Sequence, residues 1–204
     1  MLTLYYAPGA CSIASHIVLE ESGESYERRR VDLAGGEQRT PEYLKINPLG
    51  RVPVLRLDDG DPLTENTAIL PYLGKRFGLW PSDPKAEAKA HSLIGFFASS
   101  VHPAHAHVSR PERYSSDSSA HPNIRETGLK TFHGFLEQID GMLAGREWFS
   151  DGYSVLDPYG FVFYVWGVRR ELPMAELANY TAFKDRMLQR PAVQRVVADE
   201  KFKI

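Results

Sequence analysis

Cys11 is the residue whose type and position are best suited to chemistry, and it is the only cysteine of the chain. It follows a Pro8-Gly9 turn and stands just before an apolar pattern at helical spacing, so we expect it at the start of a helix. Unpaired N–H groups and the positive end of the helix dipole favour an anion there, which can lower a thiol pKa and make the thiol reactive. The alternative is a small, buried apolar residue. Because no second cysteine stands at the Cys-x-x-Cys spacing, a dithiol redox cycle is excluded.

Two further groups of polar residues have a structural explanation. On one helix His102 and His105 share a face while His107 points elsewhere, and no acidic residue lies nearby at helical spacing. This arrangement would chelate a metal poorly, so we expect no metal site. Ser154 and Asp157 could act as a hydroxyl and an acid, but they have the spacing of a capping box in front of an apolar helix. We therefore interpret them as a helix cap.

The elements that must position Cys11 alternate between strand and helix. A strand, an apolar helix ending near Gly23 and a second strand fit within about thirty residues, the size of a βαβ unit with parallel strands. An Asp-Asp-Gly-Asp turn then predicts a hairpin, followed by a helix. The expected strands are 2–6, 26–31, 53–57 and 63–64, and the expected helices are 13–23, 41–44 and 67–77.

The rest of the chain has helical patterns throughout. The segment 156–170 is apolar on nearly every face, which predicts a central, buried helix. The other expected helices are 84–108, 123–144, 174–189 and 192–198. We thus predict an α/β domain with βαβ-ββα order over residues 1–78, a linker over 79–84, and an all-helical C-terminal domain over 85–204.

Composition narrows the class of protein. The 204 residues include 24 basic and 26 acidic side chains, for a net charge of −2, which predicts no strong electrostatic hold on nucleic acid or anionic membrane. The longest apolar stretch, near 161–168, is far shorter than the ~20 residues of a membrane helix. Pro8-Gly9 comes too early for a signal peptide, so we expect a cytoplasmic protein.

Four motifs occur in order, each at the boundary of an expected element. They are Tyr6-Ala7-Pro8-Gly9-Ala10-Cys11-Ser12, Asn47-Pro48-Leu49-Gly50-Arg51-Val52-Pro53, Thr64-Glu65-Asn66-Thr67-Ala68-Ile69 and Ser154-Val155-Leu156-Asp157. With them the whole chain resembles a cytosolic glutathione S-transferase, and it is most similar to the bacterial beta class, whose mark is the Pro-Gly-Ala-Cys-Ser turn. This resemblance implies a thioredoxin-like N-terminal domain, a helical C-terminal domain, and glutathione as co-substrate without a metal.

The resemblance also implies how glutathione is held. The Val52-Pro53 peptide bond would be cis, with the Val52 backbone paired to the cysteinyl part of glutathione. Glu65 would hold the ammonium of the γ-glutamyl end, and N–H groups near Asn66 would hold its carboxylate. Cys11 would lie beside the thiol and form any mixed disulfide with it. Simple helix capping by Glu65 or Asn66 is the alternative.

Hydroxyl and imidazole groups are the expected catalytic donors. Ser12 and His102 would stabilise the glutathione thiolate, with Tyr6 as a third candidate that is better explained by packing, and Ser99 as a polar neighbour of the site. Two thiolates would repel each other, so we expect conjugation to rest more on Ser12 and His102 than on Cys11.

The expected activity is conjugation of glutathione to small apolar electrophiles by a two-fold homodimer. Pro103 and Gly95 replace the Lys and Asn that beta-class relatives often carry, which alters the expected contacts of the partner subunit with glutathione. The alternatives are a glutathione-dependent isomerase, dehalogenase, peroxidase or monothiol exchange enzyme, or a non-catalytic binding protein, because fold alone does not decide function.

Overall fold

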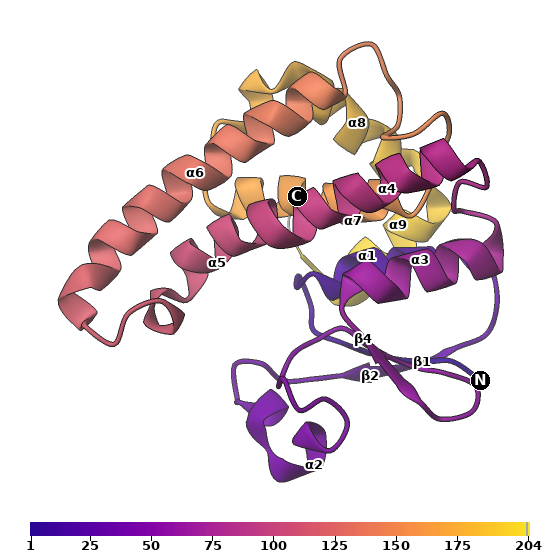
Figure 1. Ribbon diagram of the computed structural model, residues 1–204, viewed down its shortest axis with the longest axis horizontal. Helices are drawn as coiled ribbons and strands as arrows, with labels where there is room; N and C mark the ends of the chain where they lie inside the picture. Colours follow the sequence, from indigo (N-terminus) through magenta and orange to yellow (C-terminus); the bar gives the residue numbers. More distant parts are fainter. Residues whose placement is uncertain (203) are drawn as a thin grey trace.

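Four short strands form one sheet in the computed structural model, which describes residues 1–202 and 204 (Figure 1). Strands β1 (Thr3–Tyr6), β2 (Glu27–Arg30), β3 (Val54–Arg56) and β4 (Pro62–Thr64) lie in the order β2-β1-β3-β4. β1 runs parallel to β2 and antiparallel to β3, and β3 runs antiparallel to β4. The predicted parallel unit and hairpin are thus confirmed.

Two helices lie between this sheet and the rest of the molecule (Figure 1). They are α1 (Ser12–Ser22) and α3 (Asn66–Phe77), whereas the short α2 (Pro41–Leu44) lies at the other side of the sheet. The first eight residues of α1 are all buried, because α1 packs against α3 and against two helices of the C-terminal part. α1 ends at Gly23, whose φ of 68° is the left-handed conformation that glycine adopts at little cost.

Six α-helices follow α3 in the part of the chain that the structure describes. They are α4 (Pro84–Phe96), α5 (His102–Ser109), α6 (His121–Met142), α7 (Leu156–Arg169), α8 (Ala178–Gln189) and α9 (Pro191–Glu200). As predicted, α7 is the central helix, with every residue from Leu156 to Gly167 buried. The larger hydrophobic core runs without a break from the α1 side of the sheet into these helices. Among the helices that the structure describes, none combines the length and apolar character that a membrane span needs.

The predicted helix 84–108 is not one regular α-helix. A π-helical turn, Phe97–Val101, separates α4 from α5, and the His102 N–H bonds the Phe97 carbonyl five residues earlier. Pro103 follows immediately and has no N–H to donate, so a regular α-helical ladder is already incomplete at this point. The predicted helix 174–189 is likewise shorter than expected, because Met174–Glu176 forms a separate 3-10 turn.

Ser154 and Asp157 form the predicted cap of α7. The Ser154 N–H donates to Asp157 Oδ2 at 2.7 Å, and the Leu156 N–H donates to Ser154 Oγ at 3.3 Å. The other Asp157 oxygen accepts the Phe149 N–H at 3.0 Å. Both side chains are buried and engaged with backbone groups, which confirms their structural role.

Candidate active site

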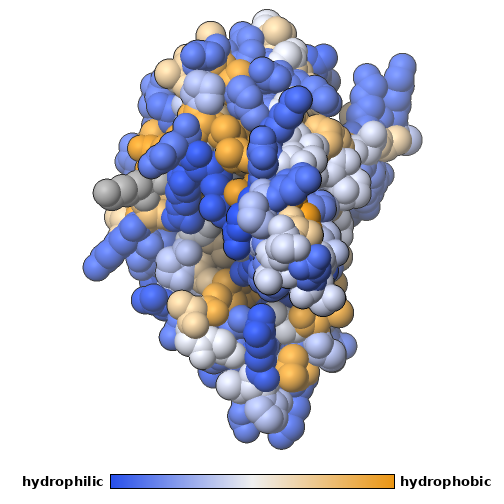
Figure 2. Space-filling view, turned by 90° about the vertical axis from the view of Figure 1, so that its left-hand side faces the viewer, coloured by the Kyte–Doolittle hydropathy of each residue, from blue (hydrophilic) through white to orange (hydrophobic). Residues whose placement is uncertain are grey.

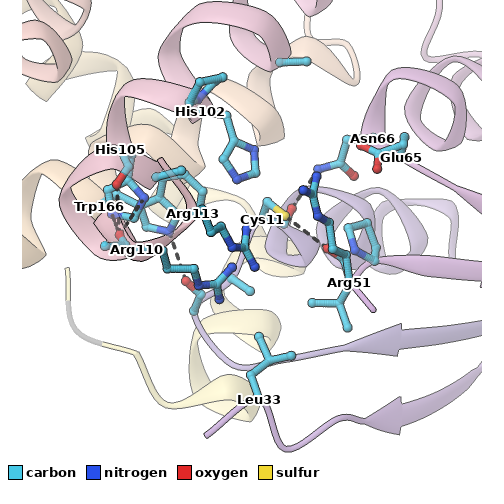
Figure 3. Close-up of a pocket in the computed structure, with 18 of the residues that line it drawn as sticks. Cys11, Leu33, Arg51, Glu65, Asn66, His102, His105, Arg110, Arg113 and Trp166 are labelled. Carbon is cyan, nitrogen blue, oxygen red and sulfur yellow. Dashed lines mark hydrogen bonds between the residues drawn. The ribbon is translucent and has the colours of Figure 1, made fainter. Parts of the chain in front are cut away.

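A cavity of about 720 Å³ contains most of the residues singled out above. One wall consists of three loops on the sheet side, around Cys11, Val52 and Glu65, and the other consists of α5, the turn after it and the end of α7. Figure 2 shows a hollow near the middle of one face of the molecule, with hydrophilic residues along much of its rim. Figure 3 shows the side chains that converge in the cavity.

Cys11 stands at the N-cap position of α1, as predicted. Its thiol donates to the Val52 carbonyl at 3.4 Å, and the Val52-Pro53 bond is cis, as expected. The prediction of a lowered thiol pKa is wrong. Burial first, and then the Glu65 carboxylate, raise the pKa of Cys11, and against the smaller opposing effects of the backbone, Arg110 and Arg51 the result is about 12. Cys11 is therefore a neutral thiol near pH 7.

Ser12 and Tyr6 do not line the cavity, so the expected contact of Ser12 with a bound thiol is not met, and Tyr6 has the packing role that the sequence favours. The Ser12 side chain is wholly buried; its hydroxyl donates to the Ala7 carbonyl and accepts the Ala7 N–H, both at 3.2 Å. Tyr6 packs with its ring centroid 5.2 Å from that of His16, which lies behind the loop. Both residues thus lie against other parts of the protein next to the loop that carries Cys11.

Glu65 and Asn66 lie where α3 begins, at the edge of the cavity (Figure 3). Glu65 has a φ of 67°, a conformation that non-glycine residues adopt at a cost and that concentrates at functional sites. The Asn66 side chain is used internally: it accepts from Ser15 Oγ at 2.8 Å and donates to the Cys11 carbonyl at 3.0 Å. This ties α3 to α1 and leaves the first N–H groups of α3 for a ligand.

His102 points into the cavity from above Cys11 (Figure 3). Burial, together with the smaller effects of the Arg51, Arg110 and Arg113 charges, lowers its pKa to about 4. The imidazole is therefore neutral near pH 7 and retains one N–H donor. Ser99, one turn before it, is exposed and does not line the cavity.

His105 lies on the same helix, α5, and also lines the cavity. Its ring stacks on Trp166 with centroids 4.0 Å apart, and the Arg170 Nε lies 3.4 Å from its Nε2. Burial lowers its pKa to about 2, with Arg170 contributing. His107 instead stacks on Tyr114, as its helical position predicts. Among the described residues, no three His, Cys, Asp or Glu side chains are grouped so that they could hold a metal ion.

The sequence analysis missed the arginines of the cavity. Five line it, namely Arg51, Arg110, Arg113, Arg169 and Arg170, whereas Glu65 is its one acidic lining residue among those described. They come from three segments far apart in the chain, so no local pattern brings them together. The only sequence signal is their individual placement next to a motif or at the end of a helix.

Gly9 is held by groups from the opposite end of the chain, which the sequence analysis also missed. Its N–H donates to Glu200 Oε2 at 2.9 Å, and its carbonyl accepts from Trp166 Nε1 at 3.0 Å and from Arg169 at 2.9 Å. Its φ is 71°, and a Cβ here would overlap the Arg169 guanidinium, so only glycine fits. Two residues before Cys11, the loop is thus fixed by α7 and α9.

Comparison with known proteins agrees with this geometry. Residues 1–75 match the family model described as glutathione S-transferase, N-terminal domain. The chain is 32% identical to glutathione S-transferase GstA of Escherichia coli O157:H7, over 99% of this chain and 100% of that protein. A glutathione transferase homologue from Sulfitobacter, crystallised with bound glutathione, superposes with a TM-score of 0.93 at 35% identity over 100% of this chain and 99% of that one.

A solved structure from Sphingomonas chungbukensis described as a bacterial beta class glutathione S-transferase is similar as well, with a TM-score of 0.86 at 31% identity over 97% of this chain and 98% of that one. The similarity of sequence and of fold thus extends over nearly the whole chain, including both walls of the cavity. The chain belongs to the glutathione S-transferase family.

Proposed function

We propose that this protein conjugates the thiol of glutathione to an electrophile in the cavity between the sheet-side loops and α5. The observation that carries the proposal is that one cavity joins Cys11, the loop with the cis Val52-Pro53 bond, Glu65 and the free N-terminus of α3. The similarity to GstA over the whole chain, and to a homologue that holds glutathione, supports it.

Glutathione lies along the sheet-side wall in this proposal. Glu65 pairs with the ammonium of its γ-glutamyl end, and the first N–H groups of α3, at Asn66 and Thr67, bind the neighbouring carboxylate, since helix N-termini bind anions. The Val52 backbone pairs with the cysteinyl residue. This places the sulfur beside Cys11 and below His102, the two groups that face the middle of the cavity.

The groups around the sulfur favour its ionised form. Cys11 stays protonated, and its S–H turns from the Val52 carbonyl to the thiolate when glutathione binds, while neutral His102 donates its N–H. The positive charges of Arg51 and Arg110 act on the same position, because they also oppose the rise in the pKa of Cys11. The thiol proton leaves to solvent, the thiolate forms a bond to the electrophilic carbon, and the leaving group departs with its electron pair. Stabilisation of the thiolate and proximity supply the rate gain.

The proposal includes a two-fold homodimer in the cytoplasm. Ser99 is exposed on the face where the sheet part of a second chain would pack against α4 and α5, and a closed two-fold dimer is the commonest oligomer. The cytoplasm keeps thiols reduced, as a glutathione-consuming enzyme needs. We propose residues 1–78 and 85–204 as the two domains, joined by 79–84.

The test combines binding and turnover. Calorimetry with glutathione and an assay with 1-chloro-2,4-dinitrobenzene should both be positive for the wild type. Glu65→Gln should weaken glutathione binding by roughly 1–3 kcal/mol, the range for a hydrogen bond to a charged group, while Glu137→Gln, at an exposed position of α6, should not. A folded protein that does not bind glutathione contradicts the proposal, and binding without turnover of any electrophile favours a non-catalytic role.

A further inference from the structure

Three of the cavity arginines approach one space from opposite walls. Arg51 directly precedes Val52 on the sheet side, whereas Arg110 and Arg113 belong to the turn after α5. Figure 3 shows Arg110 and Arg113 on one side of Cys11 and Arg51 on the other. Burial lowers the pKa of Arg113, and the charges of Arg110 and Arg51 lower it further, so the three cations act on one another.

No carboxylate in the described part of the chain forms an ion pair with these three arginines, and the one that acts on Arg113 from a distance is its chain neighbour Glu112. In the described part of the chain, the arginine ion pairs involve Arg28, Arg29, Arg76, Arg190 and Arg195, and none involves an arginine of the cavity. Glu65 is the one acidic lining residue, and the proposed function assigns it to the ammonium of glutathione. Holding like charges together in a partly buried cavity is unfavourable unless an anion binds between them.

The carboxylates of bound glutathione would not neutralise all three arginines. Its γ-glutamyl carboxylate lies at the N-terminus of α3 in the proposed function, and its remaining carboxylate lies along the sheet-side wall, within reach of Arg51. Arg110 and Arg113 lie instead on the wall that faces glutathione, where the electrophile must bind. Tyr114 lines the same wall and is largely exposed; one face of its ring stacks on His107, and the rest offers flat apolar surface beside the two cations. Trp166 is buried beneath His105 and adds only its edge.

We propose that the electrophile carries a carboxylate on a flat apolar body, and that Arg110 and Arg113 bind this carboxylate. The inference rests on the proposed function and specifies the class of electrophile. The apolar body agrees with the small apolar electrophile expected from the sequence. The carboxylate is the additional requirement. Arg110 and Arg113 are specificity-determining residues in this scheme, and the guanidinium fork suits a carboxylate better than a neutral group.

A matched pair of electrophiles tests the assignment. 4-Chloro-3,5-dinitrobenzoate and its carboxamide differ only in charge at the position opposite the chlorine. With either, the glutathione sulfur bonds to the ring carbon that carries chlorine, the C–Cl bond breaks, chloride leaves with the bonding pair and the thiol proton passes to solvent. No oxidant or reductant takes part. Each kcat/KM is divided by the rate constant of the uncatalysed reaction, which removes the intrinsic difference between the two compounds.

The wild type should prefer the carboxylate by at least about tenfold, the scale of one hydrogen bond between charged groups. Arg110→Gln and Arg113→Gln should each lower this preference several-fold, and the double variant should abolish it. Arg146→Gln is the matched control, because Arg146 is exposed and lies outside the cavity. A wild type that uses the carboxamide equally well overturns the inference while the proposed function stands.

Loss of both rates together in the arginine variants, with a raised KM for glutathione and an unchanged preference, also overturns the inference, since it assigns the arginines to glutathione. A second measurement does not depend on turnover. The carboxylate conjugate with glutathione should bind the wild type at least about tenfold more tightly than the carboxamide conjugate, and equal affinities in calorimetry overturn the inference. Failure of the proposed function would differ from either result, because neither glutathione nor any conjugate would bind.

Discussion

His16 Nδ1 and Glu200 Oε1 lie 2.7 Å apart although the two residues are separated by 184 positions, and both side chains are fully buried. The other Glu200 oxygen accepts the N–H of Gly9. One carboxyl group of α9 therefore connects α1 with the turn that precedes Cys11. The Glu200 carboxyl group therefore stabilises the folded protein and also fixes the position of the turn at Gly9.

We expect Glu200→Ala to lower the free energy of unfolding by about 3–5 kcal/mol, because it leaves buried hydrogen-bonding partners of a charged group unpaired. Glu200→Gln keeps an acceptor for Gly9 and should lose less. Urea unfolding followed by circular dichroism measures both, with the exposed Glu147→Ala as control. A loss below about 1 kcal/mol for Glu200→Ala would show that the buried pair does not hold the turn.

Cys11 should be alkylated slowly. Since burial raises its thiol pKa to about 12, the thiolate is scarce near pH 7 and the alkylation rate should keep rising with pH up to at least pH 9. Mass spectrometry after timed exposure to iodoacetamide gives the rate, with a cysteine-containing peptide as reference. A rate that reaches its plateau below pH 7 would mean that the helix N-terminus, and not burial, controls this thiol.

Replacement of Cys11 should separate hydrogen bonding from nucleophilic chemistry. The S–H group donates in the proposed mechanism, so Cys11→Ser should keep more conjugating activity than Cys11→Ala, on the order of tenfold more for one retained hydrogen bond to a thiolate. The measurement is kcat/KM for glutathione with 1-chloro-2,4-dinitrobenzene. Equal activities of the two variants would remove Cys11 from the mechanism.

His105 should make the protein less stable in acid. Its pKa is lowered to about 2 in the folded state, against about 6.5 when unfolded, so from about pH 6 down to pH 4 only the unfolded state gains this proton. Stability should fall as pH falls, by ~1.4 kcal/mol per pH unit for this one group. His105→Asn should reduce the slope of unfolding free energy against pH by that amount. His91→Asn, at an exposed position, is the control, and an unchanged slope in His105→Asn contradicts the argument.

The proposed dimer has a direct test. Light scattering at micromolar concentration should give about twice the chain mass of 23.0 kDa. A mass near that of one chain would contradict the dimer and, with it, any contact of Ser99 with a partner's site.

Local patterns were sufficient for most of the fold. β1, α1 and α7 are recognisable because β-favouring residues before a Pro-Gly turn, a glycine C-cap and apolar residues on nearly every face are properties of neighbouring residues. The irregular turn before His102 had a local signal as well, the proline at 103 inside a helical pattern. It was missed because apolar spacing alone does not register a missing N–H donor.

The site was predictable only in part, because several of its properties depend on distant segments. Cys11, Val52 and His102 share a cavity as expected. The pKa of the Cys11 thiol is raised, whereas the prediction was a lowered value. The thiol is buried by contacts with α5 and α7, which the helix-dipole argument did not include. The convergence of the arginines depends on the packing of both walls. Ser12 is turned away from the cavity by two local hydrogen bonds with Ala7, which the position of a hydroxyl at a helix start does not indicate.

The hydrogen bonds that α7 and α9 make with Gly9 have a consequence for biosynthesis. Gly9 and Cys11 are translated before the helical part, and Glu200 is added 191 residues after Gly9. The strands and α1 can form earlier, but the turn before Cys11 lacks its fixed partners until α9 exists. A nascent or truncated chain would therefore carry an unfinished thiol site, and its maturation is coupled to completion of the helical part.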